Sequence, residues 1–178
     1  QYVYSNPIIY FDPNGLEVWG FGVEVSGTLG VRGAVGVQFV FDYHKNIGIA
    51  AYVSAGSGLP ADIGIVGTVS YTPDADSIFD LAGMSSGVGG SIQFPIFSAG
   101  FDVTFAPASD GSLLTQYTLS FGAGISPMPL EMHGGIVQEK VVSFAQMAEF
   151  IKDFIWNNFG GPVTEAIYST YIEPYFDM

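Results

Sequence analysis

The chain has 178 residues, enough for one domain with a sizeable core. Its formal charge of −13, from 17 acidic and 4 basic residues, argues against nucleic-acid binding and favours a basic partner. The absence of cysteine excludes disulfides and cysteine-ligated metal sites, and nothing in the composition calls for a cofactor. The 24 glycines, 15% aromatic residues and only 12% charged residues are typical of tightly closed β-structure, membrane-inserting β-proteins included.

The first segment, residues 1–16, is rich in aromatic residues and ends in a tight turn at Pro13-Asn14-Gly15. Residues 2–16 resemble the end of the core of Rhs (YD-repeat) proteins, which closes on an Asp-Pro-x-Gly-Leu motif. The matching residues are Tyr2, Tyr4, Asn6, Pro7, Asp12, Pro13, Gly15 and Leu16.

The resemblance implies a role and a domain boundary. In that family an aspartyl-protease activity of the core cuts after this motif, here after Leu16, and frees a variable C-terminal toxin domain. It implies that residues 17–178 are such a polymorphic toxin domain, exported within a larger delivery protein and paired with an immunity protein. The acidic chain suggests a basic surface on that partner. The remainder of the protease is not in this chain, so self-cleavage is not carried over.

The longest regular pattern runs from Leu16 to Asp42 and alternates with a period of two. Its odd positions are mostly apolar, whereas its even positions are mostly small residues with single polar ones such as Glu24, Arg32 and Gln38. This pattern indicates β-structure with one apolar face. Because the stretch is too long for one ordinary strand, we expect a turn or bend within residues 27–33. The apolar odd residues are Trp19, Phe21, Val23, Val25, Leu29, Val31, Val35, Val37, Phe39 and Phe41.

Further strands follow with similar alternation. We expect two between residues 47 and 72, separated by Gly58-Leu59-Pro60, and later ones at residues 91–94, 99–106, 113–125 and 130–138. The fold class is therefore mainly β with α at the C-terminus. It is an antiparallel up-and-down barrel or sandwich of about seven or eight strands.

Two regions break the strand pattern. Residues 74–83 suggest a helical turn capped by Asp74 or Asp76. A calcium site using these residues and Asp80 is disfavoured because EF-hand landmarks are missing. The C-terminal segment 143–173 predicts two helices. The first begins with a Ser143–Gln146 capping box, and the second spans 162–173. We expect the first helix to pack on the sheet or plug the barrel, since membrane-active helices usually carry more basic residues.

Few residues indicate catalysis, so a non-enzymatic protein is favoured. Glu131 and His133 would share one face of a strand and could pair an acid with a base, although such pairs are more often structural. His44 falls in a turn. Dispersed carboxylates such as Glu24, Asp62 and Asp102 could serve an enzyme, but in a water-soluble fold they would face solvent.

Three classes of function remain open. The first is a membrane-attacking β-pore with its apolar face in lipid. The second is a non-catalytic soluble barrel that binds a small apolar or cationic ligand, and the third is an enzyme toxin. We expect a Rhs-type effector domain built as a soluble barrel, and leave open whether the even face is covered or lines a channel. Oligomeric state is not predicted. The candidate ligand-binding residues are Trp19, Phe21, Phe39, Tyr117 and Phe121.

Overall fold

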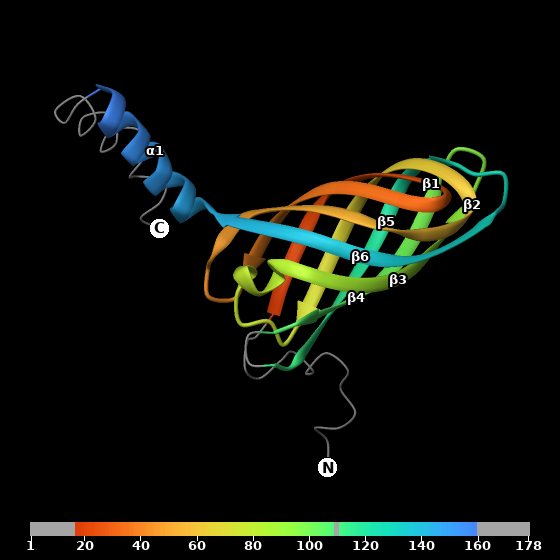
Figure 1. Ribbon diagram of the computed structural model, residues 1–178, viewed down its shortest axis with the longest axis horizontal. Coiled ribbons are helices and arrows are strands. Elements are labelled where there is room, and N and C mark those ends of the chain that lie inside the picture. Colours follow the sequence, from red (N-terminus) through yellow and green to blue (C-terminus); the bar gives the residue numbers. More distant parts are fainter. Residues whose placement is uncertain (1–16, 109–110, 160–178) are drawn as a thin grey trace, which may run out of the picture.

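A computed structural model describes residues 17–108 and 111–159 and shows an antiparallel β-barrel from which one helix projects (Figure 1). The fold class expected from the sequence is thus confirmed. The elements are β1 (Glu17–Asp42), β2 (Ile47–Pro73), the short 3-10 helix η2 (Ile78–Leu81), β3 (Gly83–Gln93), β4 (Ser98–Pro107), β5 (Leu113–Ile125), β6 (Leu130–Ser143) and α1 (Phe144–Phe159).

The barrel closes through β2, which has a different neighbour along each half. Residues 48–59 of β2 pair with β6, and residues 63–71 pair with β5. The order β2–β5–β4–β3–β6 then returns to β2, and β1 pairs with β2 along both halves. Every pairing is antiparallel, as the short connections predict.

β1 folds back on itself within the range where the sequence predicts a bend. The β1–β2 register shifts between Thr28 and Gly30, and Gly30 adopts a positive φ of 75°, which glycine tolerates without strain. As a result the rings of Phe21 and Phe41 stack with centroids 6.0 Å apart. Both β1 and β2 continue through their bends, so the described residues form six continuous strands. Because the two halves of β1 and the two halves of β2 each run along the barrel separately, the wall contains eight strand passes, in agreement with the seven or eight strands expected.

The later strands agree with the sequence to different degrees. β4 and β5 lie where the alternation predicts them, and β6 runs five residues beyond the predicted end at Gln138. β3 was mostly missed, because only residues 91–94 were expected while the strand begins at Gly83. Its sequence, GMSSGVGGSIQ, has too few apolar residues to show a period.

The interruption after β2 forms η2, with a cap different from the one expected. Ser77, and neither Asp74 nor Asp76, is the N-cap, and it forms a capping box with Asp80. Asp74 instead occupies a left-handed turn position with φ 62°. The Ile78 backbone N–H donates to Asp42 Oδ2 at 3.1 Å, which ties η2 to the end of β1.

The C-terminal helix begins as predicted but does not pack on the barrel as predicted. The Gln146 N–H donates to Ser143 Oγ at 3.1 Å, and the Ser143 N–H donates to Gln146 Oε1 at 3.2 Å. Beyond its first turn, where Phe144 meets Phe39, α1 points away from the barrel (Figure 1). The predicted second helix, 162–173, and the Rhs-like segment, 2–16, lie outside the described residues.

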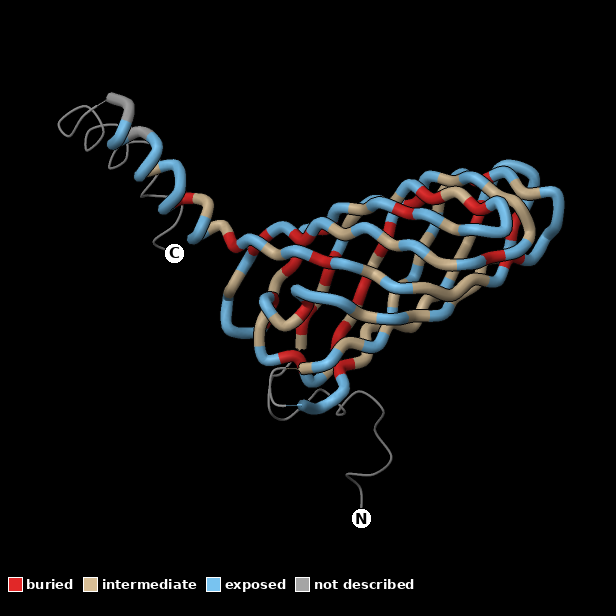
Figure 2. Tube along the Cα trace, in the orientation of Figure 1, coloured by how far each residue is buried: buried red, intermediate tan, exposed pale blue. Residues whose placement is uncertain are grey.

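The buried apolar core occupies only one end of the barrel, which we call the η2 end. Ile78 of η2 is fully buried there beside Val18, Val40, Ala50 and Leu114. The opposite end consists of the bends of β1 and β2 and the β3–β4 and β5–β6 turns. Between the two ends the strands alternate between exposed positions and buried or half-buried ones (Figure 2).

Glycines on the inward face let neighbouring strands and side chains approach closely. A Cβ on Gly22 would lie 2.7 Å from Cα of Gln38, whereas one on Gly33 would meet nothing within 4 Å. We therefore expect Gly22→Ala to lower the free energy of unfolding by about 1–3 kcal/mol through overpacking, and Gly33→Ala to change it little. Urea unfolding followed by tryptophan fluorescence checks this, and equal stability of the two variants would contradict it.

Candidate functional site in the barrel interior

The distribution of polar and apolar residues across the barrel wall is inverted relative to a water-soluble protein. The outward positions are odd-numbered in β1, β2, β4 and β5 and even-numbered in β3 and β6, and they carry most of the large apolar side chains. Phe21, Val23 and Val25 of β1, for example, are 46% to 52% exposed. The inward positions carry glycines, hydroxyls, amides and carboxylates.

This arrangement corrects two expectations from the sequence. Glu24, Asp62 and Asp102 were expected to face solvent, but all three line cavities inside the barrel. The candidate ligand residues Phe21, Phe39, Tyr117 and Phe121 lie on the outer wall with 41% to 50% exposure, and Trp19 packs beside Tyr71 on the same face. The narrow barrel accommodates the small face inside and leaves the bulky face outside.

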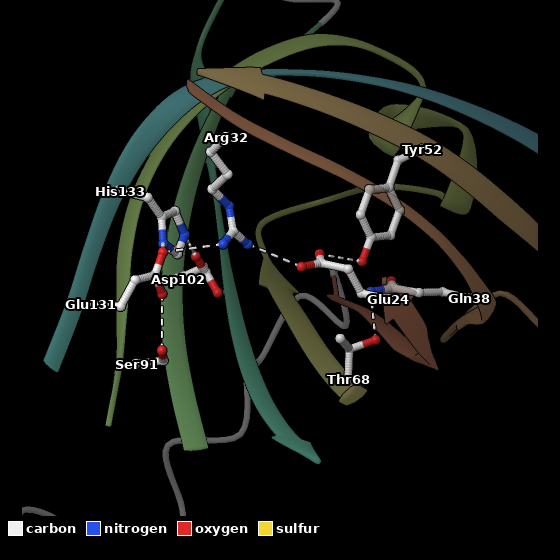
Figure 3. Close-up of polar contacts among 9 residues, drawn as sticks. All are labelled: Glu24, Arg32, Gln38, Tyr52, Thr68, Ser91, Asp102, Glu131 and His133. Atoms are coloured by element: carbon white, nitrogen blue, oxygen red, sulfur yellow. Dashed lines mark hydrogen bonds and ion pairs between the residues drawn. The ribbon is translucent and has the colours of Figure 1, made fainter. Parts of the chain in front are cut away.

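An ion-pair network centred on Arg32 crosses the interior (Figure 3). The guanidinium group donates from Nη2 to Glu24 Oε1 at 3.0 Å and from Nη1 to Glu131 Oε1 at 3.2 Å. These side chains are 11%, 16% and 2% exposed respectively, so the network is largely removed from bulk water. Two carboxylates sharing one guanidinium satisfy a buried positive charge well.

His133 extends the network to a third carboxylate. Its Nδ1 lies 2.8 Å from Glu131 Oε1, and its Nε2 lies against Asp102 Oδ1. Because ionised carboxylates only accept hydrogen bonds, an imidazolium that donates from both nitrogens fits this position. Glu131 also accepts a bond from the Ser91 hydroxyl at 2.9 Å. With both ring nitrogens bound, His133 is held in place and is not free to act as a base.

Tyr52 fixes the β1 side of the network, and a separate group of polar contacts lies around Gln38. The Tyr52 hydroxyl donates to Glu24 Oε2 at 2.9 Å. Gln38 lies beside Gly20 and Gly22, donates to Thr68 Oγ1 at 3.2 Å, and accepts from Ser70 at 2.9 Å. The Arg32 network, with Tyr52 and Ser91, thus cross-links five of the six strands across the interior.

Three cavities follow one another along the interior. The central one includes Tyr52, Thr104, Gln116 and Glu139 and has a volume of about 80 Å³. It shares Glu24, Arg32, Asp102 and His133 with a cavity toward the opposite end. It shares Thr104, Gln116 and Glu139 with a cavity that reaches Asp80 and Leu81 at η2. The Arg32 network therefore stands between the central cavity and the one toward the opposite end.

The sequence found part of this site. It paired Glu131 with His133, and the structure brings them together and adds Asp102 and Glu24 to the same network. It missed Arg32, Tyr52, Gln38 and Ser91 as partners. His44 lies in the exposed β1–β2 turn, where its ring contacts the Asp76 carbonyl. Among the described residues no group of His, Asp or Glu is arranged to hold a metal, Asp74, Asp76 and Asp80 included.

The fold and interior define a closed antiparallel barrel with a polar inside and an apolar outside. In the part of the chain that the structure describes, no helix is both long and apolar enough to cross a membrane. The chain matches no family model, no curated protein and no solved structure.

Proposed function

We propose that the chain is a membrane-inserting β-barrel effector domain. The observation that carries this proposal is the apolar outer wall, which surrounds the barrel and is not limited to one patch. Each of the six strands contributes exposed large apolar side chains to it. Soluble monomers rarely expose apolar patches larger than a few hundred Å², whereas a lipid-facing barrel needs an apolar wall on all sides.

Closure of the barrel supports the same proposal. In lipid, each backbone N–H and C=O must find its partner inside the protein, and only helices and closed barrels achieve this. The ring β2–β5–β4–β3–β6 is closed by antiparallel pairing. Almost all charged side chains of the strands point inward or lie near the η2 end, with Lys140 the exception on the outer face of β6. The middle of the outer wall thus carries no charge that lipid would have to desolvate.

The two ends differ in the way that one-sided insertion requires. The turns of the opposite end expose Leu29, Leu59, Ile96 and Met128, with exposed fractions of 58% to 83%, and the charged residues near these turns, Arg32, Asp62 and Glu131, point inward. The η2 end carries Lys45, Asp74, Asp76 and Asp80 in its turns. An uncharged end can cross a bilayer at much lower cost than a charged one. We therefore assign the opposite end as the one that enters the membrane first.

α1 fits a position at the membrane surface beside the η2 end. Its exposed residues include Phe150, Phe154 and Trp156, next to the charged residues Glu149, Lys152 and Asp153. Aromatic rings beside polar groups are typical of the membrane–water interface. The helix would then act as an interfacial anchor for the inserted barrel.

Delivery by a Rhs-type protein is the second part of the proposal. It is supported by the motif at Asp12, Pro13, Gly15 and Leu16, which resembles the end of that family's core. A protein delivered in this way would meet the target membrane from one side, as the asymmetry of the barrel ends requires. The net charge of −13 favours an immunity protein with a basic surface.

A soluble barrel that binds a cation is the alternative that one observation favours. The interior cavities are lined by carboxylates, which suit a cationic ligand and not an apolar one. A barrel that binds an apolar ligand is no longer supported, because the aromatic candidate residues face outward. Only the membrane proposal, however, also accounts for the outer wall.

Vesicles test the proposal directly. We expect the full chain, refolded from urea in the presence of liposomes, to float with them and resist extraction at high pH. We also expect it to carry current across a planar bilayer, because its interior is polar. A chain that stays in the aqueous phase as a stable monomer without detergent, and leaves vesicles intact, would contradict the proposal.

A further inference from the structure

The interior carries more acidic than basic side chains, and this excess is not cancelled by the Arg32 network. The three cavities are lined by six carboxylates, Glu24, Asp62, Asp80, Asp102, Glu131 and Glu139, against two basic groups, Arg32 and His133. Arg32 and His133 contact Glu24, Asp102 and Glu131. Neither contacts Asp62 or Glu139, which lie in different cavities.

Both of these remaining carboxylates have a buried oxygen without a hydrogen-bond donor. Glu139 is 7% exposed, and its Oε1 has no partner among the described residues. Thr72 Oγ1, also buried and unpartnered, lines the same cavity beside η2. In the cavity toward the opposite end, Asp62 Oδ1 and Gln93 Oε1 are likewise without donors. Each side of the Arg32 network therefore presents unpaired oxygen atoms to the interior.

Unpaired carboxylate, amide and hydroxyl oxygens in an acidic interior are suited to small hard cations. Such cations prefer oxygen ligands, and rings of acidic residues make pores selective for cations. Burial raises the pKa of Glu139 to about 7. Above that pH an anion would meet uncompensated carboxylates on both sides of the network, in an interior that screens charge weakly. The same oxygen atoms that are costly when unpaired would be satisfied by a passing cation.

We propose that the barrel interior admits small monovalent inorganic cations and rejects anions, with Glu139 and Asp62 as cation stations on either side of the Arg32 network. The inference rests on the proposed membrane function and names its permeant class. Cations would move from the cavity beside η2, through the central cavity, to the cavity at the opposite end. The Arg32 network separates the two stations, because Glu24, Arg32, Asp102 and His133 lie in the layer that both cavities share.

A planar bilayer with a potassium chloride gradient tests the selectivity. We expect the reversal potential of the full chain to lie toward the potassium equilibrium value, and the variant Glu139→Gln with Asp62→Asn to move it toward zero. The control Asp153→Asn, in α1 outside the interior, should leave it unchanged. A reversal potential at zero or toward chloride in the unmodified chain would overturn the inference.

A binding measurement separates this inference from the membrane proposal. In detergent, potassium chloride should raise the unfolding midpoint of the unmodified chain above that in choline chloride of equal ionic strength. The Glu139→Gln, Asp62→Asn variant should lose this difference. Potassium stabilisation without any bilayer current would support the cation stations and overturn the membrane function. Current without potassium preference and without stabilisation would support the membrane function and overturn the cation stations.

Discussion

Replacing Arg32 with methionine should lower the free energy of unfolding by about 3 kcal/mol. Its guanidinium is the only group that contacts both Glu24 and Glu131 among the described residues, and all three side chains are mostly buried. Removing one member of a buried ion pair leaves an uncompensated charge, which costs about 3–5 kcal/mol. We place the cost at the lower end because Glu131 keeps His133 and Ser91 and Glu24 keeps Tyr52.

Urea unfolding in detergent measures this loss, and two further variants identify its cause. Arg32→Lys should be intermediate, because an ammonium group is a compact charge and does not provide the planar fork that serves two carboxylates. Adding Glu131→Gln to Arg32→Met should recover part of the loss, since a neutral amide leaves less charge unpaired. If the Arg32→Met variant were as stable as the unmodified chain, the network would not hold the interior together.

The variant Leu119→Arg should abolish or strongly weaken membrane insertion. Leu119 lies on the outer wall of β5, 46% exposed, with Val69 of β2 and Phe101 of β4 opposite it in the neighbouring strands. An arginine near the middle of the lipid-facing wall of a barrel costs about 2–4 kcal/mol. Flotation of the refolded variant with liposomes measures the effect.

The same substitution in a turn is the matched control. Tyr43 is 72% exposed in the turn between β1 and β2, at the η2 end, and Tyr43→Arg adds the same charge outside the apolar wall. We expect Tyr43→Arg to float with liposomes as the unmodified chain does. If the barrel were water-soluble, Leu119→Arg would instead improve its solubility without loss of stability.

The sequence predicts much of the wall but not which face lies inside. Period-two alternation identifies the strands and assigns residues such as Phe21 and Glu24 to opposite faces. A barrel can form with either face on the inside. Whether its outside meets water or lipid decides which of the two faces lies outward. The small even face was informative, because residues such as Gly20 and Gly22 leave room for Gln38 in a narrow interior. β3 stayed mostly hidden because a glycine- and serine-rich strand has no apolar period.

The interior site was only partly predictable for a related reason. Glu131 and His133 are two positions apart on one strand, so the sequence alone brings them together. Arg32 and Glu131 are 99 positions apart, and only closure of the barrel through β2 and β6 sets their distance. Tyr52 reaches Glu24 only because β1 folds back near Gly30. Such contacts depend on strand register, which no local pattern encodes.

The central claim is that the outer wall faces lipid, and nitroxide accessibility on β5 tests it most directly. Because the chain has no cysteine, single cysteines at Tyr117, Leu119 and Phe121 can each carry one spin label, with Tyr43→Cys in the β1–β2 turn as the water-exposed reference. In liposomes we expect the three β5 labels to be accessible to oxygen and shielded from a water-soluble nickel complex, unlike the reference. Free access of the nickel complex to all three labels would show that the wall faces water and would contradict the account.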